Sequence, residues 1–212
     1  MTAISDLNKK AIKPDVLAEL AIEDEKLLDA LLQGISPDVQ KAVLRENSSK
    51  ALVFMAEQWP ETLLPHWSYF IGLLKSDNGF SKVVAIRVIT SLIPLETTGL
   101  FDKAFNVFFD LLDDKSVMVA SHTAGLSGKI AKAKPSLQSR ITKRLLDIDK
   151  THFDPSRQGL IKSYIIEALD QYFAESKNKT EIIAFVKQQV NCASPKTRKM
   201  AKAFLKKWEG SV

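Results

Sequence analysis

Apolar residues recur along most of the chain at the spacing of an α-helix. Trp67, Phe70, Ile71 and Leu74 follow the pattern i, i+3, i+4, i+7, which places four apolar side chains on one helical face. The same periodicity marks further segments at residues 85–93, 101–112, 137–148, 161–172 and 201–208. No segment of useful length alternates with period two, as a half-buried strand would. The pattern therefore predicts an all-α protein.

Short polar breaks separate these stripes, and their composition is typical of helix starts. Serine and aspartate accept hydrogen bonds from the free N–H groups of a first helical turn, and proline fits the next position. Such residues stand at Ser36-Pro37-Asp38, Ser76 to Gly79, Asp113-Asp114, Asp154-Pro155 and Ser194-Pro195. Shorter breaks lie between them. The predicted order is a helix, a short turn, a second helix and a slightly longer turn, repeated along the chain.

The starts of the second helices recur at a nearly constant interval. Taken at Pro37, Gly79, Asp114, Asp154 and Ser194, they are 42, 35, 40 and 40 residues apart. The last two units align without a gap, so that Ile161 matches Ala201 and Tyr164 matches Phe204. The first unit is less regular, because the polar run from Arg45 to Lys50 predicts a helix break or a face away from the core. A period near 40 with two helices per unit is typical of helical repeat arrays.

The segment from Ser194 to Trp208 resembles the second helix of a HEAT repeat, with proline, arginine, alanine and leucine at helical spacing. Earlier units match the family by period alone. The resemblance implies a short right-handed α-solenoid of about five HEAT-like helical pairs, whose second helices line the concave surface. We expect a single domain over residues 1–212, with an N-terminal capping region at 1–23. The expected pairs cover residues 24–58, 65–94, 98–133, 135–175 and 178–210.

Composition narrows the class of protein. The chain has 212 residues, of which 45% are apolar and 26% charged, and this balance excludes wholesale disorder. Its single cysteine, Cys192, excludes an internal disulfide and any Cys-x-x-Cys site. No stretch of 18 apolar residues predicts a membrane span, and the N-terminal residues lack the apolar centre of a signal peptide. We therefore expect a cytoplasmic protein that does not bind membranes.

Positive charge gathers toward the C-terminus. Residues 129–212 contain 18 Lys and Arg against 8 Asp and Glu, whereas residues 1–128 contain 12 against 17. Eight residues after each second-helix start stands a basic or imidazole side chain: Arg45, Arg87, His122, Lys162 and Lys202. We name these five residues the basic ladder. By the family resemblance, the ladder would line the concave face and bind an extended acidic partner. Two alternatives stay open: structural pairing with the turn residues Asp38, Asp77, Asp114 and Asp154, and coincidence of register.

The last helix adds a second basic surface. Arg198, Lys199 and Lys206 are candidate contacts to phosphates or to an acidic partner, and Lys199, Lys202 and Lys206 share one helical face. The alternative is a solvated face that caps the end of the array. The aromatic residues at helical spacing, such as Phe101 and Phe105, are predicted to be core residues.

Signatures of catalysis are lacking. The three histidines are not spaced for metal binding, so we expect no metal and no cofactor. The segment Gly125-Leu-Ser-Gly-Lys129 matches neither a nucleophile elbow nor a phosphate-binding loop. Its small residues instead predict close packing against the next unit at Tyr164 and Ile165.

Three functional hypotheses follow. The first is a non-enzymatic scaffold or adaptor that holds a protein or an extended acidic partner on its concave face. The second is a nucleic-acid-binding protein related in fold to the alkylpurine DNA glycosylases, without catalysis, acting through the basic C-terminal half. The third is a subunit of a larger assembly, joined through the apolar residues near 83–88 and 117–119. The sequence determines neither the partner nor the oligomeric state.

Overall fold

The computed structural model describes Leu7 and residues 13–208, and every regular element within them is helical. The all-α prediction is therefore confirmed. The chain divides into two compact units, Met1–Ala104 and Phe105–Val212, which we call unit 1 and unit 2. The single-domain expectation stays a prediction. Among the described residues, no helix combines the length and the apolar character needed to cross a membrane.

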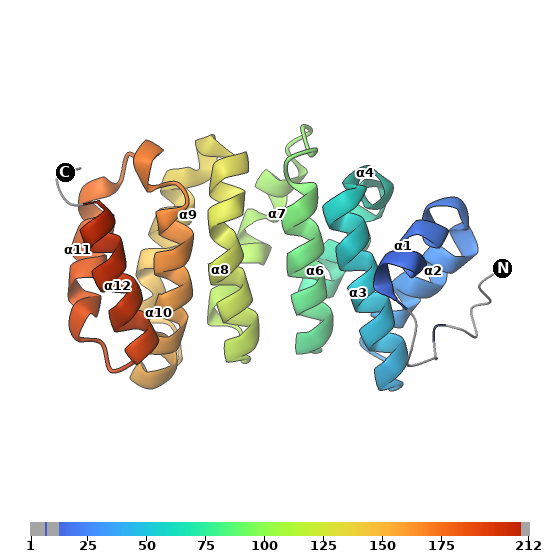
Figure 1. Cartoon of the computed structure of the whole chain (residues 1–212), viewed down its shortest axis with the longest axis horizontal. Helices are drawn as coiled ribbons and strands as arrows, with labels where there is room; N and C mark the ends of the chain where they lie inside the picture. The colour runs from blue at the N-terminus through green and yellow to red at the C-terminus, as the bar shows by residue number, and fades with distance from the viewer. Residues whose placement is uncertain (1–6, 8–12, 209–212) are drawn as a thin grey trace. The chain divides into compact units, whose positions relative to one another are not determined.

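Unit 1 is built around its longest helix, α3. Its helices are α1 (Pro14–Glu23), α2 (Glu25–Gly34), α3 (Ala42–Gln58), α4 (Pro60–Leu63), α5 (Trp67–Leu74) and α6 (Gly79–Leu92). Helix α3 packs against α1, α2 and α6, and α5 packs against α6 (Figure 1). The starts of two helices follow from capping: Asp24 accepts hydrogen bonds from the first turn of α2, and Asn78 from the first turn of α6.

Two details of unit 1 correct the sequence-based expectations. Helix α3 begins at Ala42 and not at Pro37, because Asn78 donates a hydrogen bond to the Pro37 carbonyl at 3.2 Å and holds that turn outside the helix. The polar run that follows does not break α3. Asn47 and Ser48 are buried, and Asn47 Nδ2 donates to the Leu7 carbonyl at 2.8 Å. These polar side chains therefore belong to the packing of unit 1.

Unit 2 has two layers of helices. Its helices are α8 (Val117–Ala133), α9 (Gln138–Leu146), α10 (Pro155–Asp170), α11 (Lys179–Gln188) and α12 (Pro195–Lys207), and α7 (Leu100–Phe109) crosses the division between the units. Figure 1 shows α8, α10 and α12 side by side, with α9 and α11 behind them. Short 3-10 turns end several of these helices, among them η3 (Asp110–Asp113), η5 (Asp147–Lys150) and η7 (Gln189–Asn191).

Two of the three predicted caps of unit 2 are present. Asp154 accepts hydrogen bonds from the backbone of Ser156 and Arg157, and Ser194 from that of Thr197. Helix α8 begins three residues later than predicted: Asp114 accepts a hydrogen bond from Ser116 N, the residue before the helix. The aromatic stripe predicted to be core is buried, with Phe101, Phe105, Phe108 and Phe109 each no more than 2% exposed.

Close packing of α8 against α10 is confirmed at two glycines. A Cβ atom on Gly128 would lie 2.6 Å from the backbone oxygen of Ala168, so no larger residue fits there without a shift. A Cβ atom on Gly125 would lie 3.5 Å from Tyr164 Cδ1, an ordinary contact distance. The small residues of α8 therefore bring the two helices together, most tightly at Gly128.

Candidate functional site

An apolar groove runs between α8 and α10 in unit 2. Its volume is about 410 Å³. It is lined by Val117, Met118, Ser121, His122, Gly125 and Leu126 from α8 and by Leu160 and Tyr164 from α10. Met118 is 47% exposed and Leu160 is 41% exposed, which is unusual for large apolar side chains. A concave apolar surface with a few polar groups has the character of a binding site.

Tyr164 and Gly125 face each other across the groove. A Cβ atom on Gly125 would lie 3.5 Å from Tyr164 Cδ1, so the ring leaves space for one methyl group above the backbone of α8. The Tyr164 ring is also covered by Lys196 of α12, whose Nζ lies 3.7 Å from the ring centroid. This cation–π contact fixes a positive charge at the edge of the groove.

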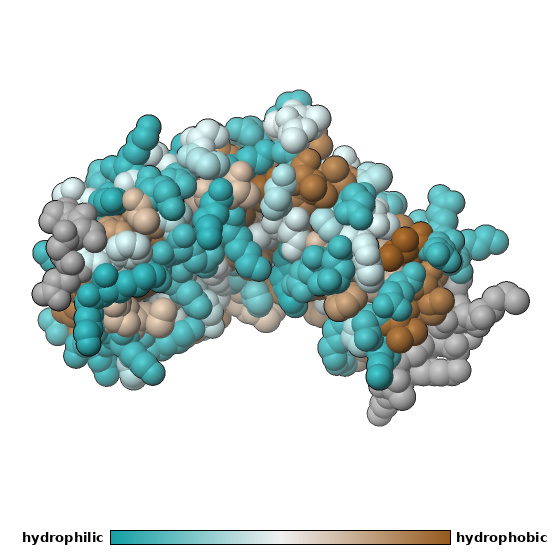
Figure 2. Space-filling model, turned by 45° about the horizontal axis from the view of Figure 1, so that its top comes forward, coloured by the Kyte–Doolittle hydropathy of each residue, from teal (hydrophilic) through white to brown (hydrophobic). Residues whose placement is uncertain are grey.

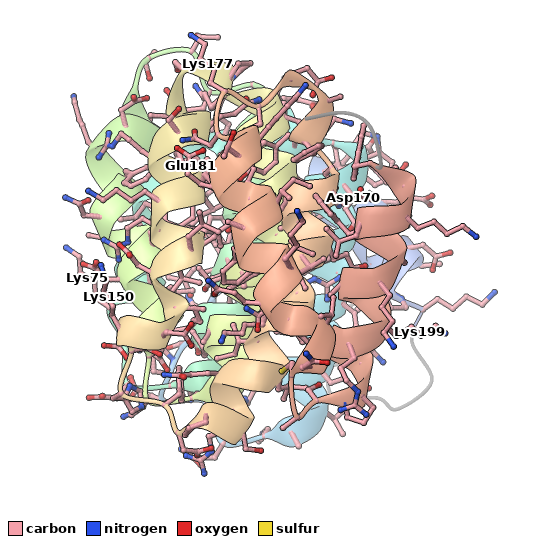
Figure 3. All side chains as sticks on the ribbon, turned by 90° about the vertical axis from the view of Figure 1, so that its left-hand side faces the viewer. Lys75, Lys150, Asp170, Lys177, Glu181 and Lys199 are labelled. Atoms are coloured by element: carbon pink, nitrogen blue, oxygen red, sulfur yellow. The ribbon has the colours of Figure 1, made fainter. Side chains whose placement is uncertain are left out.

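Helix α12 continues the positive charge away from the groove. Lys199, Lys202 and Lys206 are exposed, and Figure 3 shows Lys199 projecting from α12. Lys207 differs, because it pairs with Asp170 of α10 at 2.8 Å. We name Lys196, Lys199, Lys202 and Lys206 the α12 lysine row. Hydrophilic side chains cover most of the face of unit 2 that Figure 2 displays.

Arg198, predicted as a contact for anions, has a structural environment. Its Nη1 donates hydrogen bonds to the carbonyls of Cys192 and Ala193 at 2.7 and 2.8 Å. These carbonyls follow the η7 turn, so the guanidinium ties that turn to α12. Its role in binding stays a prediction, as do those of Lys199 and Lys206.

The basic ladder divides between the two units. In unit 1, the Arg45 guanidinium lies 4.3 Å from the centroid of Phe80, and Arg87 lies 3.9 Å from a carboxylate oxygen of Glu57. In unit 2, His122 lines the groove, and Lys202 is exposed. Lys162 is only 13% exposed and pairs with Asp149 at 2.7 Å. A single row of five binding residues stays a prediction.

Two ladder residues have structural partners, but these partners differ from the ones that the pairing hypothesis named. Arg87 and Lys162 pair with Glu57 and Asp149 and not with the turn aspartates that the interpretation named. Glu57 lies on the preceding second helix and Asp149 in the turn before α10. Arg87 and Lys162 therefore bind neighbouring elements, but through carboxylates that the repeat register did not single out.

Three of the six apolar residues proposed to join a larger assembly are buried inside the chain. Val84, Val88 and Val119 are no more than 2% exposed, whereas Val83 and Val117 are half-buried. Met118 is exposed, and it belongs to the groove. Elsewhere, unit 1 exposes Val16, Leu20 and Ile22 on α1, where Figure 2 shows a hydrophobic area.

Sequence reasoning missed the groove itself. Met118 was assigned to an apolar patch and Tyr164 to helix packing, and Leu160 was not singled out. The available signal was Leu160, an apolar residue just outside the stripe formed by Ile161, Ile165 and Ala168. No group of three or more His, Cys, Asp or Glu side chains within the described part of the chain is placed to hold a metal ion.

Similarity to known proteins is confined to structure. The chain matches no protein-family model and no curated protein. An engineered protein superposes with a TM-score of 0.62 at 13% identity and 99% coverage of both chains. A designed armadillo repeat protein in complex with the peptide (KR)4 gives 0.59 at 14% identity, covering 96% of each chain.

A further designed armadillo repeat protein gives a TM-score of 0.54 at 15% identity, with 96% of this chain and 97% of that chain covered. The fold is a HEAT/armadillo-like α-solenoid. At these identities the likeness establishes the fold alone.

Proposed function

We propose that this chain is a non-enzymatic binding scaffold that holds an extended acidic protein segment on the solvent-facing surface of α8, α10 and α12. The observation that carries the proposal is the apolar groove between α8 and α10 beside the α12 lysine row. An apolar groove supplies buried area, and the lysines supply long-range attraction for carboxylates.

The structural neighbours support a peptide as the ligand class. One of the designed armadillo repeat proteins was solved with the peptide (KR)4, which is basic. The surface of α8, α10 and α12 would attract a ligand of the opposite charge, because α12 presents lysines and Tyr164 is covered by Lys196. Charge complementarity therefore favours an acidic segment over a basic one.

The groove favours a protein over a nucleic acid. Binding to a phosphate backbone rests mainly on cations and needs no apolar groove. In this chain the exposed side chains of Met118 and Leu160 stand beside the lysines. A protein segment with both apolar and acidic side chains engages both features, whereas a duplex engages only the second.

Fluorescence anisotropy with the full chain tests this proposal. The ligands are a labelled acidic peptide with interspersed leucines and a labelled DNA duplex, each at 50 mM and 200 mM salt. We expect the peptide to bind at both salt concentrations and more tightly than the duplex at 200 mM. Duplex binding that exceeds peptide binding and falls by orders of magnitude with salt would contradict the proposal.

Matched variants locate the surface. Replacing Lys199, Lys202 and Lys206 together by glutamine is expected to weaken the peptide at least tenfold. The control replaces Lys75, Lys177 and Lys187, which are equally exposed lysines on other elements. Equal losses in the two triple variants would mean that only net charge matters, and the proposed face would be wrong.

A further inference from the structure

We propose that the groove selects one bulky apolar side chain of the acidic segment, and that Lys196 and Lys199 bind a carboxylate about three residues away from it. This inference rests on the proposed function and adds the recognition rule. The ligand would be a short linear motif in which an apolar anchor and an acidic residue are separated by a fixed spacing.

The anchor follows from the composition and size of the groove. A volume of about 410 Å³ accommodates a leucine or an aromatic side chain. Met118 and Leu160 lie on opposite walls, one on α8 and the other on α10. An apolar side chain seated between them removes their exposed surface from water, which stabilises the bound state.

The carboxylate position follows from the contact between Lys196 and Tyr164. The ammonium group is already held 3.7 Å from the ring centroid, at the α12 side of the groove. This contact uses one side of the ammonium and leaves N–H donors for a ligand. Lys199, one turn further along α12, is exposed and supplies a second cation.

The spacing follows from helix packing. Neighbouring helices lie about 8–10 Å apart, and an extended chain advances about 3.3 Å per residue. The groove lies between α8 and α10, and the Lys196 ammonium reaches back from α12 to the Tyr164 ring of α10, so the segment covers no more than about one helix spacing, or about three residues. Glu167 is exposed on α10 one turn beyond Tyr164, and its charge disfavours a ligand carboxylate at that end.

The test compares two labelled peptides against the full chain. One has a central leucine with a glutamate three residues away on each side, and the other has glycine in place of the leucine. The wild-type chain is expected to bind the leucine peptide at least tenfold more tightly. Equal affinity for the two peptides would overturn the anchor and leave the proposed function standing. If neither peptide binds and a duplex does, the proposed function fails as well.

Two variants with matched controls complete the test. Leu160→Asp is expected to abolish the preference for leucine, whereas Leu95→Asp, at a residue 42% exposed in unit 1, keeps it. Should Leu160→Asp lower the melting temperature, Met118→Ser replaces it, because Met118 is the exposed residue of the opposite wall.

The double variant Lys196→Gln, Lys199→Gln is expected to weaken both peptides at least fivefold. It should leave the ratio between them unchanged, because the anchor is intact. The control is Lys75→Gln with Lys177→Gln. A double variant that binds like its control would overturn the carboxylate position.

Discussion

Units 1 and 2 differ in the balance of neutral and ionic contacts that join distant parts of the chain, although unit 1 also has the ion pair between Arg87 and Glu57. In unit 1, neutral side chains donate to backbone carbonyls: Asn47 to Leu7 at 2.8 Å, Tyr69 to Leu32 at 2.6 Å, and Ser81 to Ile35 at 2.8 Å. In unit 2, Thr197 donates in the same way to the Gly159 carbonyl. Unit 2 adds the ion pairs of Arg144 with Asp110 at 2.6 Å and of Lys207 with Asp170 at 2.8 Å, and the His152 ring lies 2.6 Å from Asp113, an ion pair when the ring is protonated. The aspartate Asp170 lies beside α12 (Figure 3).

The two units also differ in charge. Unit 2 has 19 Lys and Arg against 11 Asp and Glu, whereas unit 1 has 11 against 14. Each ion pair of unit 2 uses one basic and one acidic group, so pairing leaves this excess unchanged, and the exposed lysines of α12 are part of it. The charge asymmetry seen in the sequence therefore becomes a surface property of unit 2.

The largest expected effect on stability tests the close packing of unit 2. Gly128→Ala is expected to destabilise the fold by about 2–3 kcal/mol, because the added methyl group would meet the Ala168 carbonyl. Gly125→Ala is the matched control on the same helix. It should be neutral or stabilising by up to about 1 kcal/mol, because alanine favours the helix and its contact with Tyr164 is ordinary. Similar melting temperatures for the two variants would contradict the packing described.

The next effect tests the neutral joins of unit 1. Asn47→Ala removes a buried hydrogen bond and leaves the Leu7 carbonyl without that donor, at an expected cost of about 1–3 kcal/mol. The loss should be the same at 50 mM and 500 mM salt, because neither partner is charged. Urea unfolding measures it, with Ser49→Ala as the neighbouring control. A strong salt dependence of the lost stability would contradict a contact between neutral groups at Asn47.

The smallest effect tests the ionic joins of unit 2. Partial burial acts to raise the pKa of Asp113. The backbone N–H and the ring of His152 both hydrogen-bond to the Asp113 carboxylate, and these bonds, together with the attraction of the ring charge, hold the pKa of Asp113 below its usual value. The pair therefore contributes stability above the unfolded pKa of the carboxyl group, and this contribution is lost as pH falls through the folded pKa. Because both groups are half-exposed, we expect less than about 1 kcal/mol.

Asp113→Asn is the variant that removes this contribution. Its free energy of unfolding should lie below that of wild type near pH 6 and converge with it in acid, with the gap shrinking in high salt. Asp29→Asn, at an exposed aspartate of α2, is the control. A gap that grows as the pH falls would have the wrong sign for this account.

Local signals in the sequence predicted much of the fold. The caps at Asp154 and Ser194 were recognisable because capping needs only adjacent residues. The start of α3 was not, because the bond from Asn78 to the Pro37 carbonyl links residues 41 positions apart. The polar side chains of α3 were misjudged for the same reason, since the partner of Asn47 is the distant Leu7 carbonyl.

The candidate site was predicted less well than the fold. The repeat register predicted a basic side chain on the helix surface at Lys202, which is exposed. It gave no indication that Lys162 pairs with Asp149 or that Lys196 covers Tyr164. The groove is lined by Gly125, which has no side chain, and by Leu160, which lies outside the apolar stripe. A space between two helices is set by side-chain volumes on both, which periodicity alone does not report.

Mapping the bound surface by NMR tests the central claim most directly. The full chain, labelled with nitrogen-15, would be titrated with the acidic peptide that carries a central leucine. The account predicts amide shifts concentrated on α8, α10 and α12, with the largest near Met118, Tyr164 and Lys196. Shifts concentrated on α3 and α6 of unit 1, or no shifts at millimolar peptide, would contradict it.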